Sequence, residues 1–147
     1  MRPGESIANA VVAAINAAPI DVDYVAGVSL PMTANTAAVC KMPRFKLEDL
    51  ADLKTCVASR SRGMTPAGRG PRQHAVAVQV MLLKKLDSDH TGLDDLLELV
   101  YAIDVLLSNQ PSLRWVSSNN DPEYDTESLE TLCLFKSVLT LNFTLIT

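Results

Sequence analysis

The fold is decided by the stretch CLFKSVLTLNFTL, which occupies residues 133–145. Most of its apolar side chains fall on alternate positions and share one face, namely Cys133, Phe135, Leu139, Leu141, Phe143 and Leu145. The other face carries Lys136, Thr140, Asn142 and Thr144. Alternation with a period of two is typical of a β-strand that buries one face. We therefore expect a long C-terminal strand that lies in the centre of a sheet.

Two other segments show the period of an amphipathic α-helix. Residues 5–17 place their apolar side chains three or four positions apart, and Pro19 should end this helix. The stronger helix follows Thr91-Gly-Leu-Asp94, which has the pattern of a capping box, and it should end before Pro111. Its apolar stripe consists of Leu93, Leu96, Leu97, Val100, Ile103 and Leu107.

The remaining segments are shorter. Strands are expected at 37–41, 53–60, 76–82 and 115–117, and a single helical turn at 47–50. Glycines and prolines interrupt residues 61–72, which predicts a loop. Residues 119–127 read as an acidic loop, and residues 20–37 as a loop or an edge strand. The expected order of elements is therefore α, β, β, β, α, β, β.

This order predicts an α+β fold. We expect a four- to five-stranded, mostly antiparallel (mixed) sheet, with two main helices packed on one face and the long C-terminal strand within it. Nothing in the composition marks a boundary or a repeat, so residues 1–147 are expected to form a single domain. A chain of this length can build its own core without a disulfide or a metal.

The composition argues against several classes of protein. The net charge of -4 gives no overall nucleic-acid footprint. Cys40, Cys56 and Cys133 are far apart and form no CxxC motif, so we expect reduced, buried thiols. The apolar runs are too short or too interrupted for a signal peptide or a membrane span, which favours assembly in a cytoplasm.

No catalytic motif is present. The chain has no GxSxG, and its glycine-rich segment at 63–70 lacks the GK[ST] of a phosphate-binding loop. His74 and His90 stand outside any motif that would give them a catalytic role. We therefore expect no catalytic residues, no cofactor and no enzymatic activity. A small enzyme would have to complete its active site across a subunit boundary.

A calcium site is the alternative from another class. Asp87, Asp89, Thr91 and Glu98, with Gly92, nearly fit the spacing of a calcium-binding loop. However, the apolar helix stripe starts at Leu93, halfway along this loop, and an alternating segment precedes it where a calcium loop has a helix. A polar turn followed by a helix N-terminus explains the same residues, so the sequence predicts no metal ligands.

The sequence also has an uneven charge distribution. Arg60, Arg62, Arg69 and Arg72 fall in the expected loop with no acid between them, whereas residues 87–104 and 121–130 are rich in Asp and Glu. Such a surface serves solubility, or it allows one subunit to meet the opposite face of the next. In the second interpretation the four arginines are interface residues, mobile in the monomer and ordered in the assembly.

From Pro43 onward, the order of features resembles tail-terminator and neck (head-tail joining) proteins of long-tailed bacteriophages. The matching parts are Pro43-Arg44-Phe45 with the turn at 47–50, the strand into Arg60-Ser-Arg62, the alternating strand into Lys84-Lys85-Leu86, the helix from Leu93 to Val100, and the strand from Leu134 to Leu141. The segment that begins at His74 lacks the aromatic residue expected there.

The resemblance implies a structural virion protein that forms a ring, with six subunits expected. The ring would cap the tail tube and join it to the head-side connector or stopper protein, while double-stranded DNA passes through without sequence-specific binding. A head-completion (stopper) protein of the same neck is the nearest alternative. Either role places the chain in the virion, assembled in the host cytoplasm and away from any membrane.

Overall fold

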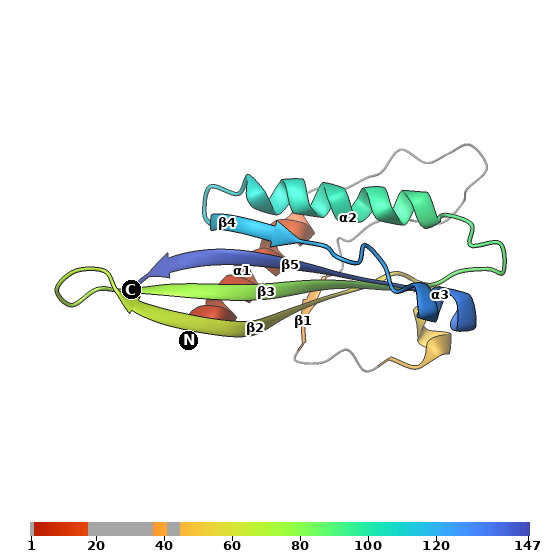
Figure 1. Cartoon of the computed structure of the whole chain (residues 1–147), viewed down its shortest axis with the longest axis horizontal. Coiled ribbons are helices and arrows are strands. Elements are labelled where there is room, and N and C mark those ends of the chain that lie inside the picture. Colours follow the sequence, from red (N-terminus) through yellow and green to blue (C-terminus); the bar gives the residue numbers. More distant parts are fainter. Residues whose placement is uncertain (1, 18–36, 41–44) are drawn as a thin grey trace.

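The computed structural model describes residues 2–17, 37–40 and 45–147 (Figure 1). Apart from Ala37, the segment expected as a loop or an edge strand at 20–37 lies outside the described residues. The elements in chain order are α1 (Pro3–Ala17), β1 (Ala38–Val39), the 3-10 helix η1 (Leu47–Ala51), β2 (Lys54–Pro66), β3 (Arg72–Lys85), α2 (Leu93–Ser108), β4 (Arg114–Asn119), α3 (Thr126–Leu132) and β5 (Leu134–Ile146).

The strands form one five-stranded mixed sheet in the order β1-β2-β3-β5-β4. β1 runs parallel to β2, and all other neighbours are antiparallel. β5 pairs with β3 along its whole length, from Leu134 opposite Lys85 to Ile146 opposite Gln73, and with β4 on its other side. The expected α+β fold, with helices packed against the sheet and a long C-terminal strand inside it, is confirmed.

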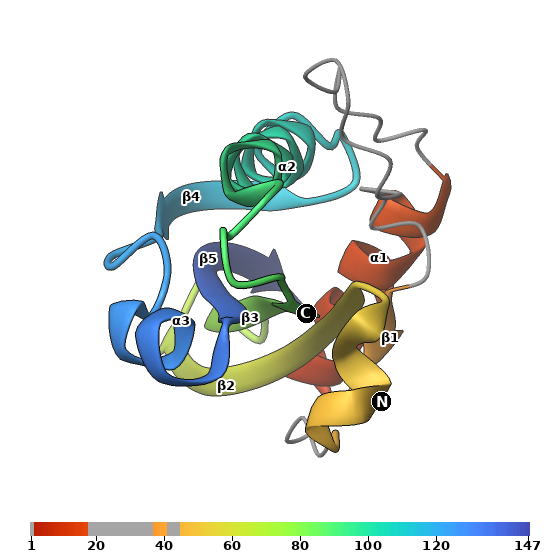
Figure 2. The same cartoon turned by 90° about the vertical axis from the view of Figure 1, so that its right-hand side faces the viewer.

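The core lies between the helices and one face of the sheet. Phe135, Leu139, Leu141 and Phe143 of β5 are each at most 1% exposed, as the alternation predicted. They join one apolar cluster with Val76, Val78, Val80 and Leu82 of β3 and with the apolar stripes of α1 and α2. The two helices also contact each other (Figure 2). The other face of the sheet carries a smaller cluster of Cys56, Ala58 and Met81, against which Cys40 and Val138 pack.

The prediction of a loop at 61–72 is wrong for most of these residues. β2 continues to Pro66, β3 begins at Arg72, and only residues 67–71 form the turn between them. The register of β1 with β2 reaches only Val57, so among the described residues the rest of β2 is an edge strand. An edge strand tolerates proline because one side of its backbone needs no ladder hydrogen bond. The glycines and prolines therefore failed to break the strand.

The acidic loop expected at 119–127 gives way to α3 from Thr126. Asp125 caps this helix, because its carboxylate accepts hydrogen bonds from the Glu127 amide (3.2 Å) and the Ser128 hydroxyl (2.7 Å). Seven residues are too few for a clear helical period, so no helix was predicted here. Cys133 is the C-cap of α3 with φ 51, and it therefore lies outside the strand in which it was expected.

The expected capping box before α2 is also wrong, although the helix begins at Leu93 as expected. The N-cap is Gly92 in a left-handed conformation (φ 89), and no side chain caps the helix. Thr91 instead donates its backbone N–H to Asp87 Oδ1 at 2.9 Å.

Among the helices of the described ranges, none is long and apolar enough to cross a lipid bilayer.

Candidate interface at the β2–β3 hairpin

The far half of the β2–β3 hairpin protrudes from the molecule. Every β2 residue from Ser59 to Pro66 is exposed, whereas Thr55 to Ala58 in the same strand are buried. Figure 1 shows the turn of this hairpin and the strand ends next to it at one end of the long axis, beyond the helices. The arginines predicted as interface residues all belong to this hairpin. They lie on its two strands and its turn, and not on one long loop.

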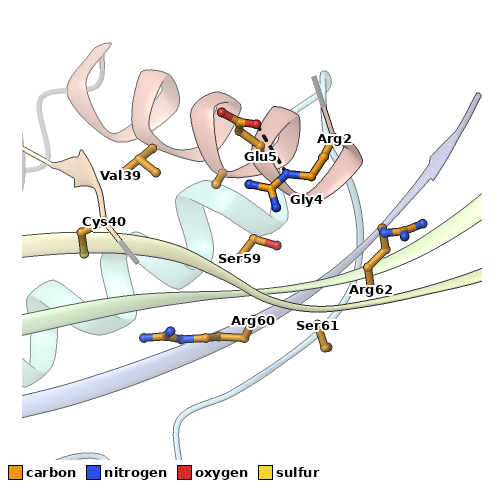
Figure 3. A pocket seen from close by; sticks show the side chains of 10 residues that line it. Arg2, Gly4, Glu5, Val39, Cys40, Ser59, Arg60, Ser61 and Arg62 are labelled. Atoms are coloured by element: carbon orange, nitrogen blue, oxygen red, sulfur yellow. Dashed lines mark ion pairs between the residues drawn. The ribbon is translucent and has the colours of Figure 1, made fainter. Parts of the chain in front are cut away.

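A β-bulge at Arg60 sets the directions of these side chains. Ser59 is opposite Val78 and Ser61 is opposite Ala77, so Arg60 is the extra residue of the bulge. Figure 3 shows the result: Arg60 and Ser61 point to one side of the strand, and Ser59 and Arg62 point to the other. Without the bulge, Arg60 and Arg62 would share a face.

Arg60 lies against the face of the sheet that the helices do not cover. Its Nε donates to Gln79 Oε1 at 2.8 Å, and a terminal nitrogen is 3.8 Å from Met81 Sδ. Both partners are on β3, so Arg60 is positioned across the ladder while its side chain stays exposed. The interactions leave it at the border of the Cys56–Met81 cluster.

Arg62 lies on the face that continues the core. Its guanidinium is 3.4 Å from Nδ1 of His74, a histidine that is only 5% exposed. Because arginine can only donate, Nδ1 accepts, which assigns the ring proton to Nε2. Nε2 in turn donates to Thr147 Oγ1 at 2.9 Å. No role was predicted for His74, yet its ring connects Arg62 of β2 to Thr147.

Arg69 and Arg72 belong to the turn region. Arg69 stands between Gly68 (φ 110) and Gly70 (φ 90), two left-handed positions that glycine adopts without strain. Ala67 donates to the Pro71 carbonyl at 3.1 Å and closes the turn. Arg72 exchanges two backbone hydrogen bonds of 3.0 Å with Thr147. The turn is therefore held by backbone geometry, and its arginines are exposed to solvent.

A surface pocket of about 400 Å³ lies between the start of α1 and β2 (Figure 3). Arg2, Arg60 and Arg62 line it, together with Glu5 and Cys40. Arg2 and Glu5 form an exposed ion pair at 3.8 Å, which contributes little to stability. The surroundings of the pocket are therefore mainly basic.

Many of the described acidic residues gather at the other end of the molecule. α3 carries Glu127 and Glu130 and follows Asp121, Glu123 and Asp125, and η1 carries Glu48 and Asp49. Figure 1 shows α3 and η1 at the end of the long axis opposite the hairpin turn. Lys46, Lys54, Lys84, Lys85 and Lys136 lie near the same two elements, and the seven acids named above outnumber them. The Ser128 hydroxyl, donating to Asp125, holds the pKa of that carboxyl below its usual range.

The residues of the calcium alternative are divided between a turn and a helix. Glu98 lies in the second turn of α2, beyond the N-cap at Gly92, whereas Asp87 and Asp89 precede the helix. The Thr91 backbone N–H donates to Asp87 and lowers the pKa of this carboxyl. Within the described ranges, no three His, Cys, Asp or Glu side chains are grouped so that they could hold a metal ion.

No protein-family model matches this sequence, and it matches no curated protein.

Proposed function

We propose that this chain is a structural virion protein of a tailed bacteriophage, a ring-forming tail terminator that caps the tail tube and joins it to the head connector. The observation that supports this best is the separation of charge along the long axis, with an exposed arginine-bearing hairpin at one end and acidic α3 and η1 at the other. A subunit with unlike ends associates head to tail, and such contacts close into rings when the rotation permits.

The arginines suit a protein interface. Their planar guanidinium groups can hold carboxylates through two parallel hydrogen bonds. In this proposal Arg69 and Arg72 contact acidic residues of a neighbouring subunit or of the tail tube, and six copies form the ring. DNA passes through the ring without being gripped, because phosphate contacts in a conduit would slow its passage. The chain needs no cofactor and no catalytic residue for this role.

A head-completion or stopper protein of the same neck is the alternative. The same hairpin would then meet the head-side connector rather than the tube. Mixing the purified chain with tail tubes and, separately, with tail-less heads distinguishes the two roles: the terminator caps tube ends, and the stopper binds heads.

The proposal is tested with the double variant Arg69→Glu, Arg72→Glu, which keeps the contact of Arg62 with His74. Native mass spectrometry and negative-stain images should show rings for the original chain and only monomers for the variant. The melting temperature should be almost unchanged, because exposed charges contribute little to stability. The matched control is Lys46→Glu, Lys85→Glu, the same change of charge at the opposite end, which should still form rings.

Two results would count against this proposal. The original chain could stay monomeric at every concentration and in the presence of tail tubes. Alternatively, the arginine variant could form rings as well as the control does, which would make the hairpin an ordinary soluble protrusion.

A further inference from the structure

The sheet brings together two cysteines that are far apart in the sequence. Ala38 of β1 is opposite Cys56 of β2, so Cys40, two residues further on, is directed to the same face as Cys56. The Cys40 backbone N–H donates to the Val57 carbonyl at 2.9 Å, which holds the end of β1 against β2. Both cysteines belong to the small cluster with Ala58 and Met81. Cys133 takes no part in this cluster, because it caps α3.

The two thiols differ in their access to solvent. Cys56 is 4% exposed, whereas Cys40 is partly exposed and lines the pocket beside α1 (Figure 3). Three arginines and one glutamate line that pocket, and their net positive charge favours the approach of small anions. Burial, and then the adjacent Cys40 thiol, raise the pKa of the Cys56 thiol to about 12. An anionic reagent therefore reacts with Cys40 first. Cys56 is buried next to Cys40 and stays protonated until then.

We propose that Cys40 and Cys56 are a paired modification site, which a low-molecular-weight disulfide converts into a disulfide bond within the chain. The Cys40 thiolate attacks one sulfur of the small disulfide, forming a mixed disulfide and releasing one small thiol. Cys56 then loses its proton to solvent and attacks Cys40 Sγ, which releases the second small thiol. Two protein thiols are oxidised and one small disulfide is reduced to two thiols.

The bond would fasten β1 to the edge of the sheet. The register of β1 with β2 comprises only Ala38 with Cys56 and Val39 with Val57. A covalent link at this point closes a loop that contains η1 and restricts the unfolded chain. The reaction requires only one subunit, so it is independent of ring formation and of the function proposed above.

The test uses the reduced full-length chain incubated with oxidised glutathione. Intact mass should fall by two hydrogen atoms without a glutathione adduct, and peptide mapping should link Cys40 to Cys56. The melting temperature should rise by about 5–10 °C, and dithiothreitol should reverse the change. Cys133→Ser, the matched control, should behave as the original chain does. Cys40→Ser should not lose the two hydrogen atoms.

The proposal is overturned by any of three results with the original chain. Glutathione could remain on Cys40, the link could include Cys133, or the thiols could stay reduced under conditions that oxidise a model dithiol peptide. These readouts do not depend on whether a variant at the buried Cys56 folds.

Discussion

Lys84 carries an ammonium group into the interior of the protein. It follows Leu83 in β3 and is only 2% exposed. Its Nζ donates to the Ala51 carbonyl at the end of η1, which ties that short helix to the sheet. Loss of hydration lowers the pKa of Lys84, and the charge of Asp52 opposes this only in part. Alternation along β3 puts Lys84 on the same face as Val80 and Leu82, and no sequence pattern indicated its partner.

This burial makes stability depend on pH. The unfolded chain protonates Lys84 below its ordinary pKa of 10.5, whereas the folded chain protonates it only at lower pH. Between these values the unfolded state binds more protons, so the free energy of unfolding should rise as the pH rises toward about 10.5. We expect the original chain to gain stability over Lys84→Met in this range, measured by urea unfolding. The contribution of Cys56 runs the other way but is common to both proteins. If the difference in the free energy of unfolding between the two proteins stayed constant with pH, the lowered pKa of Lys84 would be refuted.

At the scale of elements, the long periodic segments were predicted well and the short or irregular ones were not. Residues 5–17, 93–107 and 134–145 each carry enough apolar positions to define a face. The hairpin was missed because glycine and proline usually end strands, and only the neighbouring strands show that β2 lies at an edge. α3 was missed because its main signal is the cap at Asp125, which looks like any other acid of a loop.

Two glycines of the hairpin differ in whether their backbone conformation requires glycine. Gly70 has φ 90, while Gly63 lies in β2, and an added Cβ would meet no atom within 4 Å at either position. The two positions therefore differ in backbone conformation and not in the space around them. Gly70→Ala should therefore lower the free energy of unfolding by about 1–2 kcal/mol. Gly63→Ala should change it by less than about 1 kcal/mol. Chemical denaturation measures both, and equal losses would show that the turn is not left-handed at Gly70.

At the scale of the whole molecule, the core combines α1, α2 and three strands into one apolar cluster. The chain should therefore fold without a metal. We expect the same melting temperature in excess chelator and in excess calcium, measured by scanning calorimetry. If chelation lowered it by many degrees, the calcium alternative at Asp87, Asp89, Thr91 and Glu98 would replace the present proposal.

The candidate sites were less predictable than the fold. The sequence showed four arginines close together, but not that a bulge turns Arg60 and Arg62 to opposite faces. The pairing of Cys40 with Cys56 depends on a parallel contact between β1 and β2, and a two-residue strand leaves almost no periodic signal. His74 of β3 likewise contacts both Arg62 of β2 and Thr147, which follows β5, and no local sequence pattern connects these residues.

The bulge at Arg60 also determines where this strand can change in length. Loss of one residue elsewhere in β2 would slip the ladder and turn every later side chain to the wrong face. Loss of Arg60 itself would leave Ser59 opposite Val78 and Ser61 opposite Ala77, with regular alternation restored. Arg60 is therefore the position in β2 where one residue can be deleted while the later side chains of the strand keep their present faces.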